Sequence, residues 1–156
     1  MIDSQDSPTG ESSGTSTGSA PAASSAALTA ALAGEYAAVW AYGLIGGRVD
    51  DEGVPAARAA LDWHRAARDR LRQRMESFGM APPPPAAAYQ TPSVTSGKEA
   101  ATLAQQVELA LVPRYADLAA AESGDLRAAA VTDGQTCAAR AVSWGAPSQA
   151  QPGIKP

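Results

Sequence analysis

Cysteine, histidine and phenylalanine are nearly absent from this sequence, which has one of each among 156 residues. The single cysteine, Cys137, excludes an internal disulfide framework and a zinc site built from cysteines. Glycine-rich phosphate loops of the Walker or dinucleotide type are absent. Alanine, in contrast, dominates residues 22–146. Because alanine is the best helix former and has a small side chain, this composition favours closely packed helices over a sheet.

Positive charge and long apolar runs are also scarce. The net charge of −4 argues against a general affinity for nucleic acid or anionic membranes. No apolar run approaches the length of a transmembrane span, and the N-terminus lacks the basic start and apolar core of a signal peptide. The sequence therefore predicts a cytoplasmic protein with no nucleic-acid or membrane partner.

The chain divides into three parts by composition. Residues 1–24 are rich in Ser, Thr and Gly and contain almost nothing apolar, which predicts a disordered leader. Residues 25–146 are long enough for one domain with a core. Residues 147–156 contain Pro, Gln and Gly and predict a flexible C-terminal tail.

Apolar residues recur at three- and four-residue steps in four stretches of the domain, which predicts four amphipathic helices. Ser24 or Ser25 can cap the first helix, and Ser123 or Asp125 can cap the last. Pro113 falls inside the third pattern and predicts a kink or a local break one turn before it. We expect these helices over about residues 25–46, 54–78, 96–121 and 124–145.

The connections between the predicted helices are short, long and short. The middle connection, about residues 80–98, contains four consecutive prolines. At ~3.1 Å per residue it can span roughly 50 Å, whereas a helix of about 24 residues is only about 36 Å long. It can therefore run the full length of the bundle and leave the second and third helices parallel. The sequence predicts an all-α, ferritin-like four-helix bundle with one long Pro-rich crossover between the second and third helices.

Each predicted helix carries one ionisable group on or beside its apolar face. A carboxylate on an apolar stripe must be paired, protonated or bound, because burying it bare costs several kcal/mol or more. With a single crossover, all four groups fall at a similar depth in the bundle. A carboxylate–histidine cluster in such a bundle is the usual setting of a di-iron or di-manganese site. The four residues are Glu35, His64, Glu108 and Asp133.

Three stretches carry a resemblance to a known family: AALAGEYAAVWAYGLIGGRV, ALDWHRAARDRLRQRMESFGMAPPPPAAAYQTP and ELALVPRYADL. Over about residues 26–146 the sequence resembles a family of small actinobacterial ferritin-like proteins of unknown function. The resemblance implies the four-helix, single-crossover fold and an actinobacterial source. It implies no established activity.

The sequence departs from the metal-binding pattern of the wider ferritin-like group, which has one Glu on each of two helices and Glu-x-x-His on each of the other two. Glu35 and Glu108 match the single glutamates. Leu61, however, stands three residues before His64, where a bridging Glu is needed, and the last helix has no histidine. These departures predict a degenerate di-metal site and no intact di-iron oxidase or ferroxidase.

Two interpretations of the cluster stay open. In the first, Glu35 pairs with His64 or Arg114 and the cluster fixes helix register in a structural or interaction module, with no catalytic residue and no cofactor. In the alternative, Glu35, His64, Glu108 and Asp133 bind a single Fe, Mn or Zn ion in a metal-dependent oxidoreductase or a metal-storage protein. Cys137 is expected to be a small core residue.

The three tryptophans bear on partners. Trp40, Trp63 and Trp144 have offset positions that leave one or two of them on the outside. If they cluster there, an apolar patch would favour a homodimer, and a purely monomeric sedimentation profile at high concentration would count against it. The sequence identifies no other protein partner.

Overall fold

The computed structural model describes residues 21–148, and this part of the chain contains four helices and no strand. The all-α, four-helix prediction is therefore confirmed. Most of the predicted leader and most of the predicted C-terminal tail lie outside the described residues. The helices are α1 (Ala22–Ile45), α2 (Val54–Ser77), α3 (Gly97–Ala121) and α4 (Gly124–Ser143).

The first helix begins earlier than its predicted start. Pro21 is the residue before α1, and Ala22 and Ala23 form its first turn, which agrees with the high helix propensity of alanine. The hydroxyl of Ser24, which was predicted to cap the helix, is instead buried and donates a hydrogen bond to Glu122 after the end of α3. The predicted start is therefore wrong by about one turn.

The third helix has a defined start and no break. Ser96 and Glu99 form a capping box, in which the Ser96 side chain accepts from the Glu99 backbone and Glu99 accepts from the Ser96 backbone. The helix is continuous through Pro113, so the predicted break is wrong. Pro113 is exposed, and the carbonyl that its missing N–H leaves unpaired can therefore bond to water.

The first helix also differs from the sequence-based expectation about membranes. By length and composition alone, α1 is apolar enough to cross a membrane, and more than half of the qualifying stretch is buried inside the bundle. The expectation that no run approaches this length is therefore wrong for α1. The same helix supplies much of the bundle core, including Leu28 and Leu32, which are fully buried.

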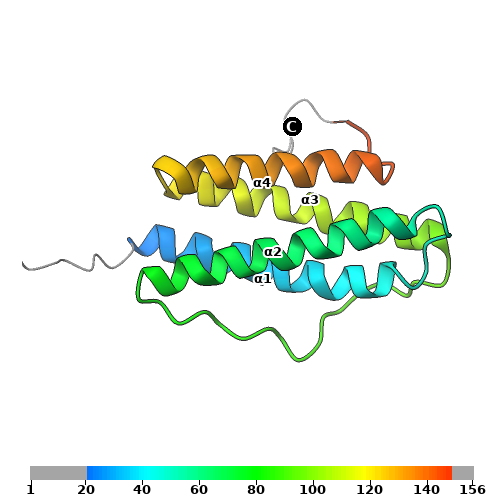
Figure 1. The fold of residues 1–156 in the computed structure, drawn as a ribbon, viewed down its shortest axis with the longest axis horizontal. Helices are drawn as coiled ribbons and strands as arrows, with labels where there is room; N and C mark the ends of the chain where they lie inside the picture. Colours follow the sequence, from blue (N-terminus) through cyan, green and yellow to red (C-terminus); the bar gives the residue numbers. More distant parts are fainter. Residues whose placement is uncertain (1–20, 149–156) are drawn as a thin grey trace, which may run out of the picture.

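The segment between α2 and α3 runs along the outside of α1 from one end of the bundle to the other (Figure 1). Tyr36 donates to the carbonyl of Pro83, the ring of Trp40 lies against Tyr89, and Arg48 donates to the carbonyl of Val94. These contacts follow α1 in chain order. As a result α2 and α3 run in the same direction, antiparallel to α1 and α4 (Figure 1).

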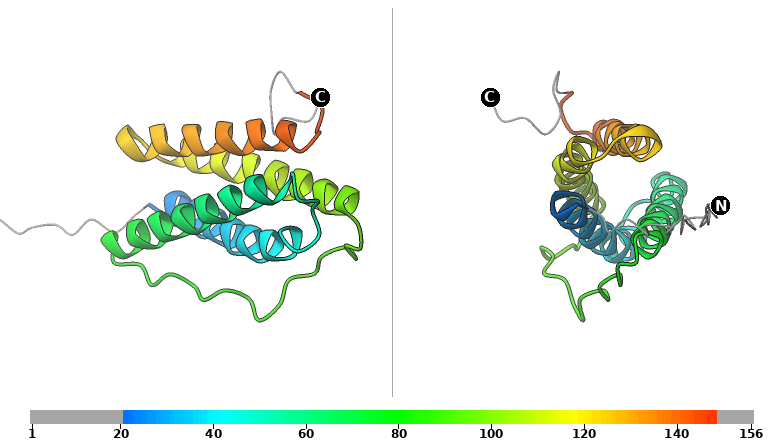
Figure 2. Two further views of the ribbon diagram at one scale, coloured as in Figure 1. Left: turned by 45° about the vertical axis from the view of Figure 1, so that its right-hand side comes forward. Right: turned by 90° about the vertical axis from the view of Figure 1, so that its left-hand side faces the viewer.

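The four helices form an open arrangement when seen end-on (Figure 2). Close backbone packing joins α1 to α2, α1 to α3, and α3 to α4. The helices α2 and α4 face each other across the remaining side, where their backbones approach much less closely (Figure 2). Side chains, rather than close helix packing, must therefore span this side.

Two apolar clusters fill the interior. One includes Leu32, Leu71 and Leu118, and the other includes Ile45 and Leu103. On α1, α2 and α3 the layer between the two clusters contains buried polar residues. On the surface, Trp40 and Leu44 lie one turn apart on α1 and are 41% and 40% exposed. Of the three tryptophans only Trp40 is among the exposed large apolar side chains of the described residues, and self-association through tryptophans stays a prediction.

At Gly34, α1 packs tightly against side chains of α3. A Cβ at this position would lie 2.7 Å from Leu111 Cδ2 and 2.9 Å from Arg114 Cδ, whereas a Cβ at Gly43 would meet nothing within 4 Å. We expect overpacking in Gly34→Ala to lower the free energy of unfolding by about 1–3 kcal/mol, which outweighs the roughly 0.5–1 kcal/mol that alanine gains over glycine inside a helix. The matched control Gly43→Ala should raise it by roughly 0.5–1 kcal/mol. Urea denaturation measures both changes, and a Gly34→Ala protein at least as stable as the wild type would contradict this description of the interface.

Candidate functional site

Three of the four predicted ionisable residues meet in the layer between the two apolar clusters. Glu35 of α1, His64 of α2 and Glu108 of α3 are each 0% exposed. His64 Nδ1 lies 2.8 Å from Glu35 Oε2, and His64 Nε2 lies 3.2 Å from Glu108 Oε1. The imidazole ring therefore lies between two carboxylates that come from different helices. We call these three residues the Glu–His–Glu cluster.

The two carboxylates determine the charge of His64. An ionised carboxylate only accepts hydrogen bonds, so the ring can donate to both only when both of its nitrogens carry a proton. Burial by itself lowers the pKa of His64, but the hydrogen bonds to Glu108 and Glu35 and the charges of both groups outweigh this effect, and the pKa is raised above its ordinary value. The geometry thus favours an imidazolium held between two carboxylates.

Two tyrosines supply further hydrogen bonds to the cluster. Tyr42 donates to Glu108 Oε1 at 2.6 Å, and Tyr115 donates to Glu35 Oε1 at 2.6 Å. Burial, together with the charge of the neighbouring carboxylate, raises the pKa of both tyrosines, so their hydroxyls stay protonated and remain donors. Trp144 Nε1 in turn donates to the Tyr42 hydroxyl at 3.0 Å.

The fourth helix contributes a cation. Arg140 Nη1 lies 3.3 Å from Glu108 Oε1, and its guanidinium lies over the ring of Trp63, with 4.6 Å between the guanidinium carbon and the ring centroid. The Trp63 ring in turn meets His64 edge-on. With His64 protonated, two positive charges face two carboxylates, so the buried charges balance.

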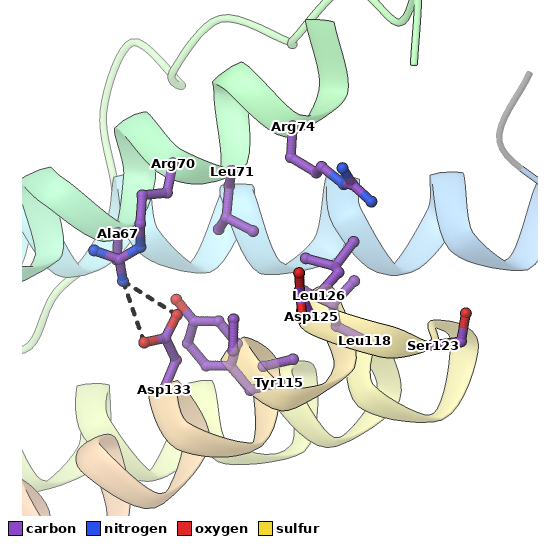
Figure 3. A pocket seen from close by; sticks show the side chains of 12 residues that line it. Ala67, Arg70, Leu71, Arg74, Tyr115, Leu118, Ser123, Asp125, Leu126 and Asp133 are labelled. Atoms are coloured by element: carbon purple, nitrogen blue, oxygen red, sulfur yellow. Dashed lines mark hydrogen bonds and ion pairs between the residues drawn. The ribbon is translucent and has the colours of Figure 1, made fainter. Parts of the chain in front are cut away.

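Asp133, the residue predicted to represent α4 in the cluster, lies elsewhere. Arg70 Nη2 is 3.2 Å from both carboxylate oxygens of Asp133 (Figure 3). Burial raises the pKa of Asp133, and the charge and hydrogen bond of Arg70 only partly offset this effect. Arg114, the other partner considered for Glu35, instead donates to the carbonyl of Ala30 at 2.8 Å. The structure thus pairs Glu35 with His64 and does not bring Asp133 or Arg114 to the cluster.

The ligand geometry does not fit a metal centre. The two ring nitrogens of an imidazole point to opposite sides, and here Glu35 faces one nitrogen and Glu108 the other. A single ion therefore cannot contact all three side chains in this arrangement. Within residues 21–148, no group of three or more His, Cys, Asp or Glu side chains is placed to hold a metal ion. A di-metal centre of the ferritin type would in addition need a carboxylate three residues before His64, where this chain has Leu61.

Two further buried groups complete the site. Glu108 Oε2 is the one buried side-chain oxygen or nitrogen in the described part of the chain without a hydrogen-bond partner. Cys137 of α4 is fully buried nearby. Burial, followed by the charges of Glu108 and Glu35, raises the pKa of its thiol. A protonated thiol is a poor nucleophile, so Cys137 functions here as a small core residue.

Sequence reasoning missed three members of the site: Tyr42, Tyr115 and Arg140. Both tyrosines fall at apolar positions of their helix faces, and periodicity does not report what a hydroxyl bonds to. Arg140 could have been identified from the sequence by charge balance. Two carboxylates and one imidazole leave a buried negative charge, and Arg140 lies two turns after Asp133 on nearly the same side of α4.

The chain matches one family model and is similar to a protein of known structure. The model of the family described as a domain of unknown function (DUF4439) matches residues 27–156. The chain is also similar to a conserved hypothetical protein, rv2844, from Mycobacterium tuberculosis, for which there is a crystal structure. The two are 32% identical over 81% of this chain and 97% of that chain, with a TM-score of 0.77. No curated protein matches the chain.

The raised pKa of His64 predicts how stability depends on pH. In the folded protein the ring keeps its proton above the unfolded value of roughly 6.5, so its contribution is complete below that pH. The contribution is lost as the pH rises through the folded pKa, because the folded protein then releases a proton that the unfolded chain has already lost. We expect the stability difference between wild type and His64→Gln to be largest at acidic pH and to shrink on the alkaline side.

Urea denaturation of both proteins across a pH series measures this difference. Arg65→Gln, on the exposed face of α2, is the control for a general effect of removing positive charge. A wild-type advantage over His64→Gln that stays constant or grows as the pH rises would show that the ring is not held as an imidazolium.

Proposed function

The chain belongs to the DUF4439 family, and we propose that it is a ferritin-like bundle that acts as a non-catalytic structural or interaction module. In this proposal the position of the ferritin-type metal centre is taken by the charge-balanced Glu–His–Glu cluster. The proposal has two parts, the ferritin-like relationship and the absence of chemistry at the cluster. Each part has separate support.

Helix order supports the ferritin-like relationship. The first and last connections are short, and the middle one, from Phe78 to Ser96, runs beside α1 so that α2 and α3 are parallel (Figure 1). Ferritin-like bundles have this single long crossover and carry inward-facing carboxylates at mid-bundle. Glu35 on α1 and Glu108 on α3 are both buried near the middle of their helices, which supports this relationship.

The observation that carries the non-catalytic part is the closure of the cluster. A catalytic group must contact its substrate, and all three residues of the Glu–His–Glu cluster are 0% exposed. Both nitrogens of His64 and three of the four carboxylate oxygens already have partners within the chain. Apart from Glu108 Oε2, the donors and acceptors that a reaction would use therefore already have partners within the chain.

A closed cluster of this kind can specify which helices pack together and in which register. A buried charge without its partner costs several kcal/mol, so an arrangement that separated Glu35, His64 and Glu108 would be strongly disfavoured. Apolar contacts are non-directional, so they specify helix register less strictly than paired charges do. The cluster therefore supplies specificity that the apolar residues do not.

Metal content tests the proposal directly. We expect protein purified without chelators to contain no stoichiometric Fe, Mn or Zn by elemental analysis. Addition of Mn²⁺ or Zn²⁺ should leave the midpoint of thermal unfolding unchanged, because a metal that binds only the folded state would raise it.

The alternative, a mononuclear metal-binding protein, makes the opposite prediction. About one ion per chain, lost in His64→Ala and kept in the exposed control Asp69→Asn, would contradict the proposal. Circular dichroism of His64→Ala shows whether the helices are retained, so that loss of metal is not confused with loss of fold.

A further inference from the structure

Among the described helices, α4 packs closely against α3 alone, and its outward side meets no other helix (Figure 2). On this side a shallow hollow of about 180 Å³ lies between α3 and α4, and no charged residue lines it. Val131 lies at the hollow, and Val142 is 44% exposed about three turns further along α4. Val131 is 43% exposed, so the two valines are two of the four exposed large apolar side chains of the described residues. We call the surface formed by Ala116 of α3 and by Val131, Gln135, Ala138 and Val142 of α4 the α3–α4 face.

Small residues produce the hollow. A Cβ at Gly134 would lie 3.2 Å from Tyr115 Cβ, so the missing side chain lets α4 pack closely on α3. Further out, the short side chains of Ala116 and Ala138 line the hollow. Its volume is about six times the roughly 30 Å³ that one water molecule takes up in the liquid. A valine side chain, with three heavy atoms, therefore fits it.

The α3–α4 face is complementary to itself about a two-fold axis. In a symmetric contact the same surface serves both partners, so a large residue needs a small one opposite it on the same face. In an antiparallel pair of α4 helices that cross at Gln135, Val131 lies opposite Ala139 of the other copy, beside its hollow. Val142 likewise lies opposite Ala128. All five of these residues are exposed. Each valine thus meets an alanine, and the two Gln135 amides can hydrogen-bond to each other across the axis.

The charges near the face also fit this arrangement. Arg127 lies one turn before Val131 on the same side of α4 and is exposed. It belongs to none of the ion pairs found among residues 21–148. In the antiparallel pair it lies beside Ser143 of the other copy, in the last turn of α4, where the helix dipole is negative. The residues at the axis are uncharged, so no like charges meet there.

The size of the face suits a second copy. The 20 residues of α4 make a helix about 30 Å long, and two helices side by side, each about 10 Å across, present a face roughly 20 Å wide. This gives roughly 600 Å² per copy and roughly 1,200 Å² for the pair, at the low end of the range of specific interfaces. The area is therefore enough for a reversible dimer.

We propose that the α3–α4 face binds a second copy of this chain through an antiparallel, two-fold contact between the α4 helices. Burial of the exposed valines drives the association, and the match of large to small residues sets its geometry. The inference rests on the proposed function, because it names the partner of the interaction module. Oligomeric state and metal content are measured separately. A metal-free monomer would contradict only the dimer, and a dimer that contains metal would contradict only the closed cluster.

Sedimentation velocity over a wide range of protein concentration tests the dimer. We expect a reversible monomer–dimer equilibrium in the wild type. Val131→Lys should weaken it about a hundredfold, because each of two equivalent positions loses the burial of a valine, which is worth about tenfold. Ala116→Phe should weaken it as well, because Ala116 is exposed and the larger side chain fills the hollow from outside.

The matched control is Leu44→Lys, which places the same charge at a 40% exposed apolar position of α1 and should leave the equilibrium unchanged. Lysine is a good helix former, so both lysine variants keep their helices, and circular dichroism checks this. A wild type that stays monomeric at the highest concentration would overturn the proposal. So would equal weakening in Leu44→Lys and Val131→Lys, or a dimer that survives Val131→Lys.

A spin label tests the antiparallel orientation. A nitroxide attached at Ala128→Cys reacts only there, because Cys137 is fully buried. When spin-labelled protein is mixed with ¹⁵N-labelled wild type, we expect broadening of the wild-type amides around Val142 and not of those around Ala128. Broadening around Ala128 instead would show a parallel contact and overturn the proposed arrangement.

Discussion

The imidazole ring of His64, buried between Glu35 and Glu108, is the interaction on which the rest of the structure depends. Its two hydrogen bonds connect α2 to α1 on one side and to α3 on the other. The backbone of α2 packs closely against α1 and against no other helix among the described residues. The ring therefore secures α2 to the other half of the bundle at mid-height, and the Arg70–Asp133 pair adds a second link to α4.

Charge balance explains why such a polar centre is tolerated in an alanine-rich bundle. Removal of one member of a buried ion pair costs about 3–5 kcal/mol, because the other charge is left without compensation. Here each carboxylate has a cation and a tyrosine hydroxyl, and Arg140 reaches the centre by stacking on Trp63. The side chains of Arg140 and Trp63 occupy the middle of the side between α2 and α4. Beyond them, towards the start of α4, a groove of about 380 Å³ opens between α2 and α4.

Most of the fold could be predicted from the sequence, because helix periodicity and connection lengths are local properties. The start of the third helix near residue 96 followed from apolar periodicity, and the layer that contains Glu35, His64 and Glu108 followed from counting residues along helices of similar length. The wrong predictions arose where tertiary contacts determine the local structure. Ser24 bonds to Glu122 instead of capping α1, and Pro113 lies on an exposed face that tolerates it.

The error at α4 has the same origin. Asp133 and Arg140 lie seven residues apart on nearly the same side of the helix, so periodicity cannot decide which one reaches the centre. The outcome depends on how far α4 is shifted along the bundle and on the length of each side chain. Arg140 can reach Glu108 past Trp63, whereas the shorter Asp133 meets Arg70. A requirement for neutrality would have favoured the arginine.

The most direct test of the imidazolium is ¹⁵N NMR of the single histidine, because chemical shifts of both ring nitrogens report their protonation. Since the chain has one histidine, the signals need no assignment. At neutral pH we predict protons on both Nδ1 and Nε2. A ring with one unprotonated nitrogen under these conditions would contradict the account.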